Sequence, residues 1–184
     1  MKGRLYYIVG ASGVGKDSLI QYARNHLIEG DEVVFAHRYI TRAPGAQGEN
    51  HIALSESEFA SRESHGLFAL AWQSHGHRYG VGVEIDEWLE RALTVVVSGS
   101  RSYMPVARER YPDMTLVWIS AEPQVLAARL ERRGRESGNE ISERLARNER
   151  LDVLPPAEAL QISNEGPLES AGRRFVEMLS RTRA

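Results

Sequence analysis

The chain has 184 residues, no cysteine and a formal net charge of −2, so it is long enough for one sizeable core and excludes disulfide scaffolds, thiolate metal sites and thiol catalysis. The slightly negative charge argues against non-specific nucleic-acid binding. No apolar run approaches the length of about 18 residues that a membrane-spanning helix needs. We therefore expect a single-domain cytoplasmic protein, a monomer or homodimer, without a nucleic-acid or membrane partner.

Short apolar runs alternate with helical patterns along the chain. The apolar runs are residues 4–10, 32–37, 93–100, 115–121 and 160–164. Their β-branched content and nearly continuous apolarity are typical of strands buried on both faces of a parallel sheet. The helical patterns are residues 16–29, 84–92, 102–111, 122–133, 140–151 and 167–181. This alternation predicts an α/β fold with three layers.

Two stretches interrupt the alternation. Residues 38–83 are rich in glycine and polar residues and predict a small inserted subdomain, which leaves a core of residues 1–37, 84–131 and 148–184. Residues 132–147 are strongly charged and contain two glycines. A charged stretch of this kind is typical of a solvated helix pair with a flexible joint.

The stretch GASGVGKDSL, Gly10 to Leu19, follows an apolar strand and opens a helical pattern. Its glycines and lysine match the G-x-x-x-x-G-K pattern of a phosphate-binding loop. In such a loop backbone N–H groups turn towards the phosphates, the helix presents its positive end, and the lysine reaches the terminal phosphates. The predicted nucleotide site comprises Gly10, Ala11, Ser12, Gly13, Val14, Gly15, Lys16, Asp17 and Ser18.

Asp17 is unusual, because phosphate loops place a serine or threonine hydroxyl for Mg²⁺ at this position. A carboxylate there would repel the β- and γ-phosphates unless a cation lay between them. The predicted strand at residues 93–100 ends without an acidic residue that would hold such a cation. We therefore expect Asp17 to hold Mg²⁺, helped by Ser18. The alternative is that Asp17 is only an acidic residue favoured in the first turn of a helix.

The segments GASGVGKDSL, RYITRAPGAQGENH, FALAWQSHGHRYG, RLERRGRE and ISNEGPLES resemble guanylate kinases in their order and approximate spacing, across nearly the whole chain. The resemblance implies a P-loop NTPase fold with a five-stranded parallel core sheet, an acceptor-binding subdomain at residues 38–83 and an arginine-bearing helical lid at residues 132–147. It also implies ATP as the donor and Mg²⁺ as the metal. A lid of this kind closes over the substrates and excludes water.

The same resemblance implies the residues that bind the acceptor phosphate. Arg42 belongs to the family's TR pair, and Tyr79 belongs to its YG pair. His51 stands where the family has another phosphate-binding tyrosine. Two positions differ, because Gly45 replaces a second arginine and Arg38 replaces a serine.

The groups that recognise guanine in the family are missing. Leu70 replaces the glutamate of its F-x-E pattern, and SGSRS at residues 98–102 replaces carboxylates at the end of the third core strand. Each guanine donor left unpaired would cost about 1–3 kcal/mol, so selectivity for GMP should be lost. The site gains Arg38, His51 and Arg78, with Arg101 as a further candidate, and these suit an acceptor with more phosphate and no base.

A GKD phosphate loop in this frame, without guanine-recognising groups, resembles the ribose 1,5-bisphosphate phosphokinase family. The resemblance implies transfer of the ATP γ-phosphoryl group to the 1-phosphate of ribose 1,5-bisphosphate, which yields 5-phosphoribosyl 1-diphosphate and ADP in phosphonate breakdown. The acceptor phosphate is already an anion, so the reaction needs positioning and charge neutralisation and no general base. Lys16, Mg²⁺ near Asp17 and the lid arginines would supply that neutralisation.

The family pattern implies that Arg133 and Arg144 are catalytic and that Arg129 binds the nucleotide. Arg129 and Arg133 are four residues apart and so share one helical face. The alternatives are Arg132, Arg135 and Arg147. Asn164, at the end of the last apolar run, corresponds to a family position near the adenine, and a strand-terminal turn is the alternative.

Three other functions stay open. A guanylate kinase with unusual base contacts is disfavoured by Leu70 and SGSRS. A guanylate kinase-like binding module without catalysis is disfavoured by the intact Gly10, Gly15 and Lys16. A small-metabolite kinase of another P-loop branch would share the loop, but it does not account for the TR and YG pairs.

Overall fold

A five-stranded parallel sheet forms the centre of the protein, as predicted. The computed structural model describes residues 3–27, 30–42, 51–133 and 154–180, with side chains up to Arg129 in the third range. The sheet has the strand order β2-β7-β1-β8-β9, and its pairings are all parallel. Its strands are β1 (Arg4–Gly10), β2 (Val33–Phe35), β7 (Thr94–Ser98), β8 (Thr115–Ser120) and β9 (Leu160–Ser163). Every residue of β7 is buried, as expected for a central strand covered on both faces.

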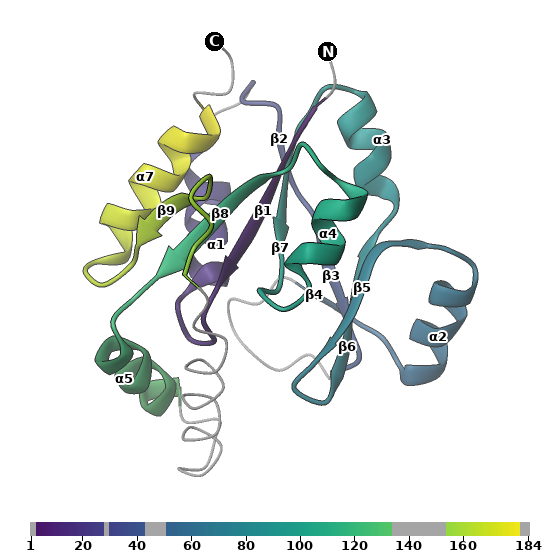
Figure 1. Cartoon of the computed structure of the whole chain (residues 1–184), viewed down its shortest axis with the longest axis horizontal. Helices are drawn as coiled ribbons and strands as arrows, with labels where there is room; N and C mark the ends of the chain where they lie inside the picture. The colour runs from purple at the N-terminus through teal and green to yellow at the C-terminus, as the bar shows by residue number, and fades with distance from the viewer. Residues whose placement is uncertain (1–2, 28–29, 43–50, 134–153, 181–184) are drawn as a thin grey trace.

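Helices cover both faces of this sheet and give the three predicted layers (Figure 1). The helices are α1 (Lys16–His26), α3 (Glu84–Glu90), α4 (Met104–Arg110), α5 (Pro123–Arg133) and α7 (Leu168–Ser180). Alternate residues of β1 point to opposite faces. Tyr6 and Ile8 pack with α1 and α7, whereas Leu5, Tyr7 and Val9 pack with α3 and α4. The predicted helix at residues 140–151 lies outside the described residues.

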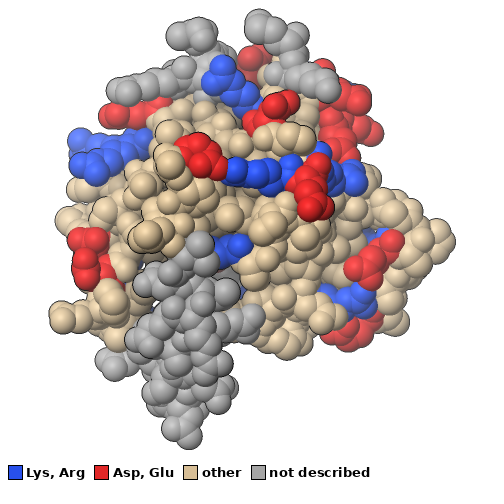
Figure 2. All heavy atoms as spheres, in the orientation of Figure 1, with Lys and Arg blue, Asp and Glu red and all other residues tan. Residues whose placement is uncertain are grey.

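Charges of both signs lie side by side on the surface shown in Figure 2. Two arginines of α4 illustrate this, because Arg108 forms an ion pair with Glu158 and Arg110 lies 2.9 Å from Asp86. These arginines are therefore neutralised locally. Among the described residues, no helix combines the length and apolarity needed to cross a bilayer.

The described residues between 38 and 82 form a second sheet of four strands, in the order β4-β3-β6-β5. Its elements are β3 (Arg38–Ile40), β4 (His51–Ala53), α2 (Glu56–Ser64), β5 (Phe68–Ser74) and β6 (His77–Gly82). Helix α2 begins after Ser55, whose hydroxyl accepts a hydrogen bond from Glu58 N. The helix packs on one face of the sheet, where the rings of Phe59 and Phe68 lie 4.6 Å apart.

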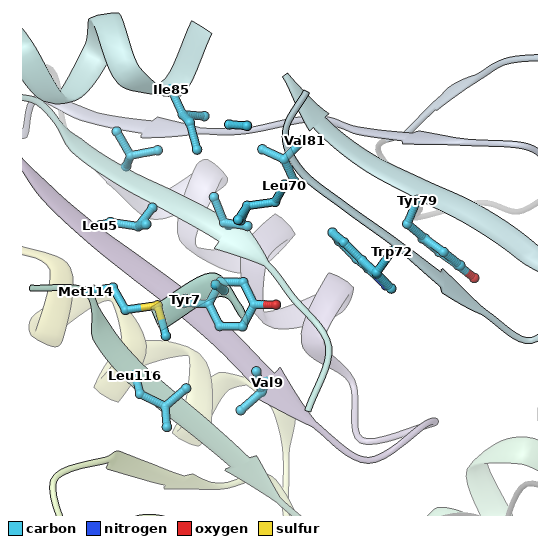
Figure 3. Packing of buried hydrophobic residues seen from close by; sticks show 14 of the residues in the cluster. Leu5, Tyr7, Val9, Leu70, Trp72, Tyr79, Val81, Ile85, Met114 and Leu116 are labelled. Carbon is cyan, nitrogen blue, oxygen red and sulfur yellow. The ribbon is translucent and has the colours of Figure 1, made fainter. Parts of the chain in front are cut away.

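The other face of the second sheet, here called the inner face, joins the main core. Leu70 and Trp72 of β5 and Tyr79 of β6 belong to the same buried cluster as Leu5 and Tyr7 of β1 (Figure 3). The inner face therefore packs directly against the central sheet and extends its core. This packing holds the second sheet at a fixed position beside the carboxyl end of β1.

Candidate active site

The loop between β1 and α1 has the geometry of a phosphate cradle. Gly13 and Gly15 have φ values of 85° and 92°, which glycine adopts without a steric penalty. Gly15 caps the amino end of α1, so the N–H groups of the first turn face the loop. Lys16 Nζ donates hydrogen bonds to the carbonyl oxygens of Gly10 at 2.9 Å and Ala11 at 3.2 Å. The ammonium group therefore lies over the loop, within reach of an anion bound there.

Two residues from distant elements hold this loop in place. The carbonyl oxygen of the buried Val14 accepts hydrogen bonds from Asn164 Nδ2 at 2.7 Å and from Arg129 Nη1 at 3.3 Å. A Cβ at Gly15 would lie only 2.6 Å from Asn164 Nδ2. The structure thus brings Arg129 and Asn164 to the predicted nucleotide site, and both contact the loop backbone. Contacts of either residue with the nucleotide itself stay predictions.

Asp17 and Arg38 join the phosphate loop to the second sheet. Arg38 Nη2 donates a hydrogen bond to Asp17 Oδ1 at 2.7 Å, and the two side chains are 13% and 31% exposed. Asp17 lies in the first turn of α1, and Arg38 is the first residue of β3. The predicted metal ligand and a predicted acceptor-binding residue are therefore in direct contact.

The oxygen atoms of Asp17 and Ser18 are compatible with an Mg²⁺ ion that is held mainly by the phosphates of a bound nucleotide. Asp17 offers a carboxylate and the neighbouring Ser18 a hydroxyl, and both are oxygen groups that suit a hard cation. The described part of the chain contains no group of three or more acidic or histidine side chains that could hold a metal ion. Mg²⁺ commonly binds through one or two carboxylates together with phosphates and water, so the residues present are compatible with it.

Three of the predicted acceptor-binding residues share the inner face. Arg38 is opposite Val81 and His51 in the strand register, and Ile40 is opposite Tyr79, so Arg38, His51 and Tyr79 lie on one side of the sheet. The ring of Tyr79 stacks on Trp72 at 5.5 Å, and its oxygen points away from the packed side chains (Figure 3). This hydroxyl makes no hydrogen bond within the described residues. Arg42 lies two residues beyond β3, at the same end of the sheet as Tyr79.

Arg78 lies on the opposite face, which corrects its grouping with Tyr79. Its guanidinium group forms an ion pair with Glu63 of α2 and lies 4.6 Å from the centre of the Phe59 ring. Neighbouring residues of a strand point to opposite faces. An acceptor that contacts Tyr79 on the inner face is therefore on the wrong side of the sheet for Arg78.

Leu70 and the residues after β7, which stand at the guanine-recognising positions of guanylate kinases, pack against the core instead. Leu70 is 1% exposed and lies in the cluster shared by the two sheets. A Cβ at Gly99 would lie 2.1 Å from the ring of Tyr7, and Ser100 N donates a hydrogen bond to the hydroxyl of Tyr7 at 3.1 Å. Burial raises the pKa of this Tyr7 hydroxyl above its ordinary value. Leu70 thus offers no acceptor for a base, and the loop after β7 is tied to the core.

Tyr103 was missed by the sequence interpretation. Its ring lies 5.6 Å from that of Trp72, so Tyr79, Trp72 and Tyr103 form a column of aromatic rings beside the site. The signal that was available is the aromatic residue at the end of SGSRSY, directly after a strand.

The lid arginines are described only in part. Arg129 lies on α5 and contacts the phosphate loop. Arg133 is the last residue of α5, and its side chain lies outside the described part, as does that of Arg132. Arg144 and the alternatives Arg135 and Arg147 lie outside the described residues altogether.

Comparisons with known proteins agree with this arrangement. No protein-family model matches the chain. A ribose 1,5-bisphosphate phosphokinase PhnN from Thiobacillus denitrificans is 50% identical over 97% of this chain and 94% of that protein. One of the same name from Burkholderia pseudomallei is 54% identical over 96% and 95%. The crystal structure of a guanylate kinase from Anaplasma phagocytophilum has a TM-score of 0.65 at 16% identity, over 98% of this chain and 86% of that chain.

The central sheet, the phosphate loop and the second sheet define an α/β P-loop protein with a guanylate kinase-like fold. The chain belongs to the ribose 1,5-bisphosphate phosphokinase family, since relatives of that name are about half identical to it over nearly their full length. It is therefore an enzyme, a kinase that uses ATP. The predicted fold class and family are both confirmed.

Proposed function

We propose that this kinase transfers the γ-phosphoryl group of ATP to the 1-phosphate of ribose 1,5-bisphosphate, yielding 5-phosphoribosyl 1-diphosphate and ADP. The observation that carries the proposal is that Arg38, on the second sheet, lies 2.7 Å from Asp17 of the intact phosphate loop. The burial of Leu70 supports an acceptor without a base. The predictions of a cytoplasmic location and of a monomer or homodimer are part of this proposal.

The donor half of the proposed site is the loop from Gly10 to Ser18. Its N–H groups and the amino end of α1 bind the phosphates of ATP, and Lys16 leaves the loop carbonyls to bind the terminal phosphates. Arg129 and Asn164 keep the loop in shape through the carbonyl of Val14. Asp17 and Ser18 would hold Mg²⁺, which when bound supplies positive charge to the β- and γ-phosphates.

The acceptor half is the inner face of the second sheet. Arg38, Arg42, His51 and Tyr79 bind the sugar phosphates, and their positive charge and hydroxyl donors suit an acceptor with two phosphates. An oxygen of the 1-phosphate forms a bond to the γ-phosphorus while the bond from that phosphorus to the β-bridging oxygen breaks, and ADP leaves with the electron pair. The acceptor oxygen is already anionic, so no side chain has to remove a proton.

Charge neutralisation is the main catalytic contribution in this mechanism. Two anions approach each other, and Lys16, which lies over the phosphate loop, is proposed to neutralise part of their charge. Arg133 and Arg144 are proposed to add positive charge from residues 132–147, as the family pattern implies. Exclusion of water by the same segment would protect the γ-phosphate from hydrolysis.

A coupled assay of ADP release tests the proposal. We expect turnover with ribose 1,5-bisphosphate and none with GMP at equal concentration. Lys16→Ala should lower kcat/KM at least about 100-fold, because it removes a charge that acts on the transferred group. Arg173→Ala, at a 67% exposed position of α7, is the control and should retain full activity. Efficient turnover of GMP, or full activity of Lys16→Ala, would refute the proposed function.

A further inference from the structure

Two of the cations beside the phosphate loop, Lys16 and Arg38, form hydrogen bonds with acceptors within the protein. Lys16 Nζ lies on the carbonyl oxygens of Gly10 and Ala11, and Arg38 Nη2 lies on Asp17 Oδ1. The lysine belongs to the donor half of the site, whereas the arginine belongs to the acceptor half and is bound to a donor-side carboxylate.

We propose that the Arg38–Asp17 ion pair couples the two substrates by exchange. When Asp17 binds the metal of a metal–nucleotide complex, it releases Arg38, and Arg38 turns to a phosphate of the acceptor. The nucleotide and the acceptor then bind cooperatively. This inference rests on the proposed function for the identity of the acceptor and for the metal at Asp17.

The position of Arg38 allows such an exchange by side-chain movement alone. Its strand, β3, pairs with β4 on one side and β6 on the other, so the backbone of Arg38 is fixed in the sheet. Within the described residues, Asp17 is the one hydrogen-bond partner of the Arg38 side chain. His51 and Tyr79 share the inner face with Arg38. A guanidinium group released from Asp17 therefore remains beside the proposed acceptor-binding residues.

A metal ion on Asp17 weakens the contact of its carboxylate with Arg38. A divalent cation on the carboxylate would lie within a few ångströms of the guanidinium group and would repel it. The exchange replaces this repulsion by two favourable contacts, metal with carboxylate and guanidinium with acceptor phosphate. Coupling of two binding equilibria is reciprocal, so the acceptor must favour the metal–nucleotide complex by the same factor.

Isothermal titration calorimetry with MgADP tests the exchange without turnover, because ADP has no γ-phosphoryl group to transfer. Arg38→Met removes the charge and keeps a long side chain. It should bind MgADP about two- to fivefold more tightly than the wild type, since a partly exposed ion pair no longer has to break. The matched control is Arg62→Met, which removes an arginine paired with Glu58 at 2.9 Å on α2 and should leave MgADP affinity unchanged.

The second measurement is the affinity for ribose 1,5-bisphosphate with and without MgADP. In the wild type, MgADP should tighten acceptor binding by about the same two- to fivefold, and ADP with a metal chelator should not. Arg38→Met should lose this tightening. Urea unfolding of both variants checks that each is folded as the wild type is.

If Arg38→Met bound MgADP as tightly as the wild type or more weakly, the exchange would be overturned. Arg38 would then have no effect on nucleotide binding or would bind the nucleotide phosphates directly. Unchanged cooperativity in Arg38→Met would overturn it as well. These results are distinct from failure of the proposed function. If the wild type failed to use ribose 1,5-bisphosphate, the comparison of MgADP affinities would still decide whether Arg38 and the metal compete for Asp17.

Discussion

Replacement of Asn164 by alanine tests how the phosphate loop is held. The amide of Asn164 is 2% exposed and donates a hydrogen bond to the Val14 carbonyl at 2.7 Å. The variant leaves that carbonyl with Arg129 Nη1 at the longer distance of 3.3 Å. The loop should therefore become less well ordered, and the protein should lose both stability and affinity for nucleotide.

The magnitude follows from the loss of one buried hydrogen bond and part of a buried side chain. The hydrogen bond contributes about 0.5–1.5 kcal/mol, and the poorly satisfied carbonyl and the small cavity raise the loss in the free energy of unfolding to about 2 kcal/mol. For a domain of this size, such a loss lowers Tm by about 4–8 °C.

Urea unfolding and thermal melting measure the stability, and calorimetry with MgADP measures nucleotide affinity. Asn25→Ala is the matched control, because Asn25 is an exposed residue of α1 that accepts a hydrogen bond from Gln21 at 3.0 Å. That control should change the free energy of unfolding by less than about 0.5 kcal/mol. If Asn164→Ala had wild-type stability and wild-type affinity for MgADP, the role of Asn164 in holding the loop would be wrong.

Three further predictions concern the packing of the core, the faces of the second sheet and the contact between α3 and α4. Gly99→Ala should lower the free energy of unfolding by about 1–3 kcal/mol in urea, since its Cβ would lie 2.1 Å from a buried tyrosine ring, and wild-type stability would contradict that packing. Tyr79→Phe should raise KM for the acceptor, whereas Arg78→Met, on the other face, should not; equal effects on KM would refute the assignment of faces. Burial and the hydrogen bond to Asp86 raise the pKa of Tyr111 from 10.0 to about 12, so the neutral hydroxyl favours the folded chain. Its contribution is complete below pH 10.0 and is lost as the pH rises to about 12. Tyr111→Phe should therefore show a shallower loss of stability over that range, and an unchanged slope would contradict this account.

The central sheet was predictable because each of its long strands corresponds to an apolar run in the sequence. Runs such as RLYYIVG and TVVVS have uninterrupted apolar centres, which are typical of short strands covered on both faces. The short strands of the second sheet were not predicted individually. β3 and β4 have three residues each and pair with each other, and β3 also pairs with β6, so the local pattern carries little signal for them.

The site was predictable where a motif fixes the geometry. The glycines and Lys16 of the phosphate loop belong to one local segment whose shape follows from its sequence. The contact between Asp17 and Arg38 depends on how two sheets pack and could not be found from spacing. The opposite orientation of Arg78 and Tyr79 could have been predicted, because neighbouring residues of a strand at residues 77–82 point to opposite faces of the sheet.

The most direct test of the central claim is ³¹P NMR of a reaction that contains the protein, MgATP and ribose 1,5-bisphosphate. If the proposed function is right, the 1-phosphate signal is replaced by a pair of coupled diphosphate signals on the sugar, in step with the conversion of ATP to ADP. Formation of inorganic phosphate alone, or of GDP when GMP replaces the sugar, would contradict an acceptor that carries phosphate and no base.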